Sequence, residues 1–219
     1  MELKMLFKDK LFWMLGVYVF AAFGFGFRYM NGLILFLGWN IILAGCAALL
    51  SYLYVHVRIT KKPLIVTLMV LGFFILFFPN TIYVMTDFIH LENYNFFIDY
   101  PSVYAFKIMD WVVVLMITWG ALLSAKLGIT SLERMKPYLY EPVKKYTYPL
   151  MAILFIASSV GIYIGRFIRL NSWDFLKIFQ VIPTLFENFS FFISFVAIYL
   201  VIHVVSYFVF SNASHNGYN

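Results

Sequence analysis

One short stretch of this chain places several polar side chains at the end of a long apolar segment. It runs from Phe78 to Leu91 and reads Phe-Pro-Asn-Thr-Ile-Tyr-Val-Met-Thr-Asp-Phe-Ile-His-Leu. At the roughly 100° per residue of an α-helix, its polar groups fall within an arc of about 120°, and they are Asn80, Tyr83, Thr86, Asp87 and His90. A carboxylate, an imidazole, a phenol and a carboxamide on one face need partners, which the rest of the chain has to supply.

A second stretch supplies cationic groups. It reads Gly-Ile-Tyr-Ile-Gly-Arg-Phe-Ile-Arg-Leu-Asn-Ser-Trp-Asp over residues 161–174. At 1.5 Å per residue, Arg166 lies about 27 Å along its apolar segment and Asn80 about 25 Å along its own, so we expect the two at the same level. An arginine just inside the membrane interface is costly unless it is paired or wetted. Asp87 and Asp174 are the expected partners.

Together these stretches predict a site for an anionic ligand, because a guanidinium fork binds phosphate or carboxylate oxygens bidentately. Small residues at Gly161 and Gly165 predict that a neighbouring helix comes close beside the arginines. The candidate ligand-binding residues are Asn80, Tyr83, Asp87, His90, Arg166, Arg169 and Asp174. A metal ion held by the two aspartates and the histidine is an alternative, but the nearby arginines oppose a cation. We expect neither a metal nor another cofactor.

Two further ionisable residues lie inside apolar segments. Asp110 either pairs with Lys107, one turn before it, or faces the same cavity as Asp87. For His203, a hydrogen bond between helices competes with a role in a proton relay. The single cysteine, Cys46, lies in an apolar run and has no internal disulfide partner.

The composition is that of an integral membrane protein. Of 219 residues, 63% are hydrophobic and 12% are charged, and the mean hydropathy is +0.88, which a soluble domain of this size does not show. The net charge of +6 does not indicate nucleic-acid binding, because the Lys and Arg residues are sorted by loop and form no single basic face.

Six segments are apolar enough and long enough to span a bilayer. We predict an all-α transmembrane helix bundle, a single domain over residues 1–219, with spans at about 11–28, 33–57, 63–79, 103–125, 148–168 and 187–210. The Lys and Arg residues concentrate before the first span, between the second and third, and in a long connection from Lys126 to Thr147. By the positive-inside rule these segments and both termini are cytoplasmic, and the two candidate stretches lie on the other side.

The position of Asn80–Leu91 stays open at this point. If the third helix ran straight, Asp87 would lie beyond the hydrocarbon, but Pro79 removes a backbone hydrogen bond and favours a bend. The stretch is then an interfacial amphipathic helix, or it folds back over the bundle. An interfacial helix usually carries Lys or Arg on its polar face, and this one carries none.

At these two motifs the sequence resembles the bacterial polytopic membrane proteins known as domain of unknown function 1361. The stretch from Phe78 to Leu91 is similar to the family pattern Pro-Asn-x-x-Tyr-x-x-Thr-Asp-x-x-His-Leu, and the segment 161–174 is its second matching motif. The similarity covers most of the chain from about the second span onward. It implies a multi-pass protein of the bacterial cell membrane and no activity.

Three functions follow from the candidate residues. The first is binding of an anionic small molecule or a lipid headgroup, with membrane lipid as the expected partner. The second is a membrane enzyme in which His90 or Asp87 acts as general base on a substrate held by the arginines. The third is a structural or accessory subunit, in which the arginine–aspartate contacts fasten helices together. The sequence does not indicate the oligomeric state.

Overall fold

The computed structural model describes residues 7–99, 103–170, 177, 183–184 and 187–211, and nearly all of them are helical. Six helical segments are long and apolar enough to cross a membrane, as the sequence predicts. They are Lys10–Arg28, Gly32–Ile59, Leu64–Asn93, Ile108–Tyr138, Thr147–Ile168 and Phe189–Phe210. The prediction of a single domain is not tested by these observations and stays a prediction.

The individual elements follow one another as short-linked helices, with one small strand pair. In chain order they are α2 (Lys10–Arg28), α3 (Gly32–Ile59), α4 (Leu64–Phe77), α5 (Asn80–Tyr83), η1 (Val84–Asn93), β1 (Phe97–Asp99), β2 (Val103–Tyr104), α6 (Ile108–Met135), η2 (Lys136–Tyr138), α7 (Glu141–Lys144), α8 (Thr147–Tyr163), η3 (Ile164–Ile168) and α10 (Phe189–Phe210). Strands β1 and β2 pair antiparallel.

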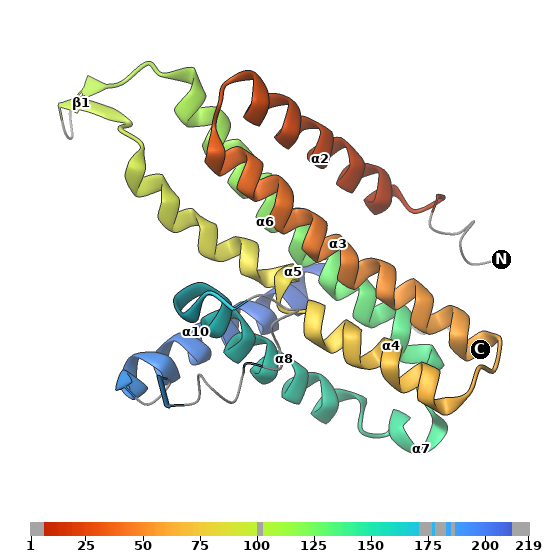
Figure 1. Cartoon of the computed structure of the whole chain (residues 1–219). Helices are drawn as coiled ribbons and strands as arrows, with labels where there is room; N and C mark the ends of the chain where they lie inside the picture. Colours follow the sequence, from red (N-terminus) through yellow and green to blue (C-terminus); the bar gives the residue numbers. More distant parts are fainter. Residues whose placement is uncertain (1–6, 100–102, 171–176, 178–182, 185–186, 212–219) are drawn as a thin grey trace.

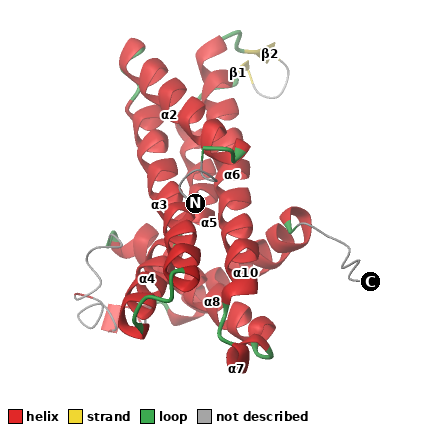
Figure 2. Ribbon diagram, turned by 90° about the vertical axis from the view of Figure 1, so that its right-hand side faces the viewer, coloured by secondary structure: helices red, strands yellow, loops and turns green. Residues whose placement is uncertain are grey.

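The long helices lie side by side, with the β1–β2 pair at one end of the bundle and α7 at the other (Figures 1 and 2). We call these the β end and the α7 end. Helices α3 and α6 form the centre, since 50% and 61% of their apolar windows are buried, compared with 17% for α2 and for α10. Helix α2 packs on one side of this centre, and the α8–α10 pair packs near α4 and α5 (Figure 1).

Local sequence signals explain where the helices begin. The Asn31 side chain accepts a hydrogen bond from the backbone N–H of Ile34, which caps α3 and closes the tight turn after α2. Asp9 caps α2 in the same way through the backbone N–H of Leu11. Pro63 directly precedes α4, as expected for a proline at a helix start.

The predicted third span, 63–79, is too short. The backbone at Pro79 keeps helical angles, φ −53° and ψ −33°, and the apolar helical segment continues to Asn93. The proline therefore does not turn the chain back over the bundle. Instead the helix changes pitch five residues later, where the 3₁₀-helix Val84–Asn93 begins.

The predicted fourth span, 103–125, is displaced. Residues Val103 and Tyr104 form β2, and α6 runs from Ile108 to Met135. The predicted cytoplasmic loop thus begins about ten residues too early, because Lys126 and Arg134 are helical. Both cations are stabilised inside the bundle: Lys126 Nζ donates to the carbonyl oxygen of Phe210, and Arg134 pairs with Asp9.

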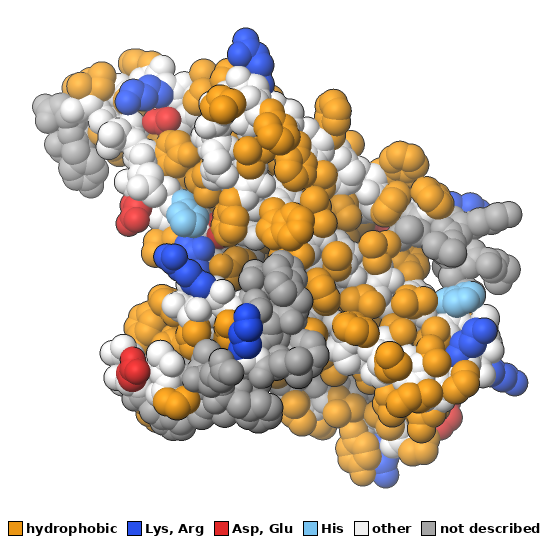
Figure 3. All heavy atoms as spheres, in the orientation of Figure 1, with side chains coloured by type: hydrophobic (Ala, Val, Ile, Leu, Met, Phe, Trp, Pro, Cys, Tyr) orange, Lys and Arg blue, Asp and Glu red, His pale blue; other side chains and the backbone are white. Residues whose placement is uncertain are grey.

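The surface is that of a protein surrounded by lipid. Hydrophobic side chains cover most of the face in Figure 3, whereas Lys and Arg side chains lie near the two ends and in a recess between the β end and the α8–α10 pair. Exposed Phe, Ile, Leu and Val side chains are found on every apolar helix. In hydrocarbon such side chains need no burial, and helix association depends on close packing and on polar contacts instead.

Candidate functional site

The third apolar segment places a carboxylate and an imidazole on the same face of one helix. In a 3₁₀-helix, residues three apart lie directly above one another, because the helix has three residues per turn. Asp87 and His90 have this spacing inside η1, and His90 Nε2 lies 4.0 Å from Asp87 Oδ1. The sequence prediction that the two share a face is thus right, although it assumed the pitch of an α-helix.

Asp87 is completely buried and both of its carboxylate oxygens are hydrogen-bonded. Oδ1 accepts from Nη1 of Arg166 at 3.2 Å, and Oδ2 accepts from the side-chain amide of Asn40 at 2.8 Å. The side chain of Asp87 is 0% exposed and that of Arg166 is 14% exposed. A buried charge in this condition requires a partner of opposite charge, so the predicted pairing of Asp87 with Arg166 is confirmed.

His90 occupies the more accessible side of the same cluster. Its Nε2 lies 3.2 Å from Nη2 of Arg166, and its side chain is 34% exposed. Because a guanidinium only donates hydrogen bonds, Nε2 accepts and the ring proton is on Nδ1. The ring also meets Phe36 edge to face, with centroids 6.3 Å apart. His90 thus presents a donor, Nδ1–H, away from Arg166.

Two glycines bring the arginine within reach. A β-carbon at Gly161 would lie 3.0 Å from Cγ of Pro79, and one at Gly165 would lie 3.2 Å from Cε2 of Tyr83. The missing side chains of these glycines permit the close approach, so the segments 79–83 and 161–165 touch at successive turns. Arg166 directly follows Gly165 in η3, and Asp87 lies about one turn beyond Tyr83 in η1. The predicted close approach at these glycines is confirmed.

The helix that carries Arg166 ends irregularly. Residues Ile164–Ile168 form a π-helical turn, and Arg169 follows in the left-handed conformation with φ 62° and ψ 32°. A π-turn is an insertion that shifts the following side chains around the helix, and such turns are frequent at functional sites. This shift explains why Arg169, placed on the Arg166 face by α-helical spacing, has an exposed side chain.

Three of the seven predicted residues therefore form one cluster: Asp87, His90 and Arg166. Tyr83 packs against the glycine next to the arginine. Asn80 donates to the carbonyl oxygen of Phe77, and Arg169 has an exposed side chain. Asp174 lies outside the described residues. The partners of Arg166, Asp87 and His90, lie two to three turns beyond Asn80 along the chain.

The sequence analysis missed Asn40. This residue is 5% exposed, and it was passed over because it stands alone in a long apolar run. That isolation is itself a signal, because a carboxamide buried in hydrocarbon needs a hydrogen-bonding partner. Two phenols also lie close enough to Asp87 for electrostatic interaction, those of Tyr18 and Tyr199. We call Asp87, His90, Arg166 and Asn40 the outer cluster.

The depth of the outer cluster can be counted from two helices. Asn40 lies about 12 Å along α3 from its first residue, Gly32, at 1.5 Å per residue. Asp87 lies about 12 Å along η1 from its last residue, Asn93, at 2.0 Å per residue. Both counts place the cluster inside the bundle by the same distance from the β end. By contrast, η3 ends only two residues after Arg166. The cluster therefore lies well inside α3 but at the end of the helical segment that begins with α8.

A second buried polar group joins α8 to α10. His203 is 0% exposed, its Nδ1 donates to the carbonyl oxygen of Tyr199 at 2.7 Å, and its Nε2 lies 2.8 Å from Oγ of Ser158. With the proton on Nδ1, the serine hydroxyl donates to Nε2. His203 is therefore hydrogen-bonded between helices, which is one of the two roles considered from the sequence.

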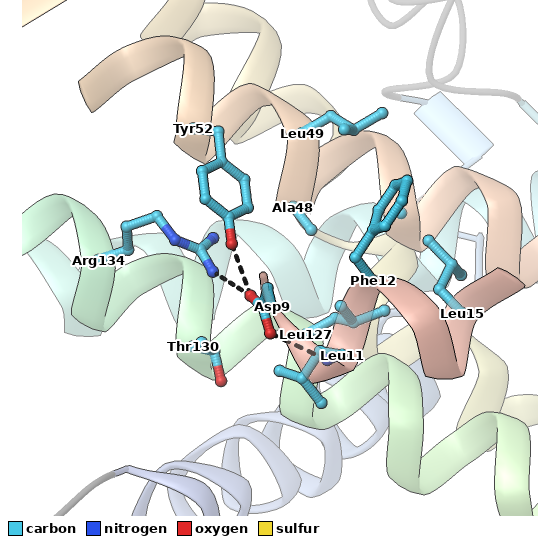
Figure 4. Close-up of a pocket in the computed structure, with 11 residues that line it drawn as sticks. Asp9, Leu11, Phe12, Leu15, Ala48, Leu49, Tyr52, Leu127, Thr130 and Arg134 are labelled. Atoms are coloured by element: carbon cyan, nitrogen blue, oxygen red, sulfur yellow. Dashed lines mark hydrogen bonds and ion pairs between the residues drawn. The ribbon is translucent and has the colours of Figure 1, made fainter. Parts of the chain in front are cut away.

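A third polar group lies toward the α7 end, between α2, α3 and α6 (Figure 4). Asp9 Oδ2 accepts from Nη2 of Arg134 at 3.0 Å and from the hydroxyl of Tyr52 at 2.6 Å. The guanidinium also stacks on the Tyr52 ring, 3.7 Å from its centroid. The cavity between these residues measures about 10 Å³, roughly enough for one water. This group fastens helices and leaves no room for a larger ligand.

No group of three or more His, Cys, Asp or Glu side chains suited to a metal ion occurs in residues 7–99, 103–170 and the described positions after them. In particular, Asp87 and His90 both face the Arg166 guanidinium, which repels a cation.

Six apolar helices with a buried charge cluster near one end define a multi-pass integral membrane protein. The chain belongs to the family described as protein of unknown function DUF1361, whose model matches residues 39–212. The match includes every member of the outer cluster and excludes α2. Neither the curated proteins nor the solved structures contain a match to this chain.

Proposed function

We propose that this protein binds an anionic group, such as the headgroup of a membrane lipid, at the exposed side of the outer cluster. The observation that supports this most directly is the position of Arg166, whose guanidinium is held by the buried Asp87 and yet stays 14% exposed beside His90. A guanidinium held in this way is ready to bind an oxyanion without ordering a flexible side chain.

The donors around Arg166 favour an oxyanion over an amine. His90 directs Nδ1–H away from the guanidinium, and Arg169 carries a second exposed guanidinium three residues along the chain. Phosphate and carboxylate oxygens accept hydrogen bonds from all of these groups. We further propose that this end of the bundle lies outside the cytoplasm of a bacterial cell and that both termini lie inside, which the excess of Lys and Arg in the other loops supports.

The experiment is thermal unfolding of the purified protein in detergent, with added lipids as probes. Phosphatidylglycerol should raise the unfolding temperature, and diacylglycerol, which has no phosphate, should not. His90→Phe keeps the aromatic contact with Phe36 and removes the Nδ1–H donor, so it should weaken phospholipid binding about tenfold, the size expected for one hydrogen bond to a charged group. His56→Phe, near the α7 end, is the matched control.

Equal stabilisation by phosphatidylglycerol and diacylglycerol would refute the proposal. So would unchanged phospholipid binding in both His90→Phe and Arg169→Ala. The second variant changes an exposed side chain, so it separates a binding defect from a folding defect.

A structural role is the second candidate, and one observation favours it. Asp87 is 0% exposed, and its two oxygens accept hydrogen bonds from side chains of two other helices. Such contacts hold helices together. If fastening is the whole role, Asp87→Asn lowers stability and no lipid response depends on His90 or Arg169. The enzyme hypothesis gains no such support, because the basic nitrogen of His90 faces the Arg166 guanidinium and has no lone pair left for a substrate proton.

A further inference from the structure

The rim of the outer cluster carries one acidic side chain that the proposed anion site does not use. Glu92 is exposed, follows His90 by two residues in η1, and is close enough to the His90 imidazole to interact with it electrostatically. Figure 3 shows an acidic side chain, a histidine and basic side chains next to one another at the recess. A carboxylate at the edge of an oxyanion site adds a place for a cation.

The order of these groups along η1 matches the order of charges in a zwitterionic headgroup. At about 2.0 Å per residue, Glu92 lies about 4 Å nearer the β end than His90. In an aminophospholipid the phosphate is attached to the glycerol, and the amine is attached beyond the phosphate, on the water side. A phosphate at Arg166 and His90 therefore brings the amine to the level of Glu92 along the helix axis.

The surroundings of the cluster favour an amphiphile over a free solute. Exposed apolar side chains flank it on three elements: Phe36 on α3, Phe88 and Ile89 on η1, and Phe167 on η3. Phe36 touches the His90 ring directly. Acyl chains can lie on these side chains while the headgroup occupies the recess, whereas a small water-soluble ion gains nothing from them.

We infer that the ligand is an aminophospholipid, with its phosphate held by Arg166 and His90 and its amine held by Glu92. This inference rests on the proposed function, because it needs the oxyanion site, and it adds the class of headgroup. It makes Glu92 a specificity-determining residue.

The experiment compares two lipids and one soluble headgroup on the full chain in detergent. The probes are phosphatidylethanolamine, phosphatidylglycerol and glycerophosphoethanolamine, and the measurement is the apparent dissociation constant from lipid-dependent thermal unfolding. The unmodified protein should bind phosphatidylethanolamine about twofold to fivefold more tightly than phosphatidylglycerol, the range expected for one exposed ion pair. Glycerophosphoethanolamine, without acyl chains, should bind much more weakly than either lipid.

Glu92→Gln should remove the preference for phosphatidylethanolamine and leave phosphatidylglycerol binding intact, and Glu92→Asp should restore part of the preference. Glu141→Gln changes an exposed glutamate near the α7 end, and it should leave the preference unchanged.

The outcomes separate the inference from the proposed function. If both lipids bind and the preference is absent, or survives in Glu92→Gln, the assignment of Glu92 is wrong and the oxyanion site stands. If glycerophosphoethanolamine binds as tightly as the lipid, the ligand is a soluble phosphate ester and the assignment of a lipid is wrong. If neither lipid stabilises the protein more than diacylglycerol does, the proposed function itself is refuted.

Discussion

Replacing Asp87 by asparagine removes one charge from the centre of the outer cluster without changing its shape. The two charges of the Asp87–Arg166 pair are 3.2 Å apart, so their attraction is about 5 kcal/mol at an effective dielectric constant of about 20. Part of this is offset by the cost of desolvation. Removing one partner of a buried pair nevertheless costs about 3–5 kcal/mol, because the other charge stays buried without compensation. We expect Asp87→Asn to lower the free energy of unfolding by this amount.

The loss has a second component that belongs to this site. Both oxygens of Asp87 accept hydrogen bonds, one from Asn40 and one from Arg166. An asparagine at this position has one oxygen and one amide nitrogen, so it faces one of these donors with a donor of its own. One of the two hydrogen bonds is therefore lost as well.

The assay is a double-mutant cycle on the purified protein, with reversible unfolding followed in bicelles. The variants are Asp87→Asn, Arg166→Gln and the double variant, with Asp110→Asn as the control for loss of a carboxylate elsewhere. The double variant has no unpaired charge, so its loss of stability should be smaller than the sum of the single losses by about 2–3 kcal/mol. Additivity within about 0.5 kcal/mol would show that the two charges do not stabilise one another.

Three other predictions concern contacts away from this pair. Gly161→Leu should lower the free energy of unfolding by about 1–3 kcal/mol, because the new side chain meets the rigid ring of Pro79. Gly16→Leu is the control: the space around Gly16 is open, so the thermal unfolding curve should change little. His203→Phe should cost about 1–2 kcal/mol; adding Ser158→Ala should recover part of that loss, and no recovery would show that the serine hydroxyl was not bonded to the imidazole. Asp9→Asn should cost about 1–3 kcal/mol, because its ion pair is only 17% and 21% exposed and its carboxylate also accepts from Tyr52; a loss below about 0.5 kcal/mol in the unfolding measurement would contradict this.

The helical membrane architecture is readable from the sequence because apolar composition and span length are physical requirements of a bilayer. The helix ends are less readable, since they depend on pairing across the bundle. Lys126 and Arg134 suggest a loop, yet each is stabilised at its helix by a partner distant in sequence, the Phe210 carbonyl oxygen and the Asp9 carboxylate.

The centre of the site is predictable for a similar reason. An acid and a base inside apolar segments must meet, so Asp87 and Arg166 can be paired without a structure. What α-helical spacing does not reveal is a change of pitch. The 3₁₀ form of η1 aligns His90 with Asp87, and the π-turn of η3 separates Arg169 from Arg166. Asn40 was missed because a single carboxamide carries no periodic pattern.

The ten-residue length of η1 has a consequence for motion. Runs of 3₁₀-helix longer than three or four residues are uncommon, and such stretches often mark hinges. If η1 rewound as an α-helix, it would shorten by about 5 Å, and the directions of Asp87 and His90 would separate by about 60°. The alignment of these two side chains therefore reports the winding of the helix. A change in the position of the β end and a ligand that holds His90 in place would therefore both act on the pitch of η1.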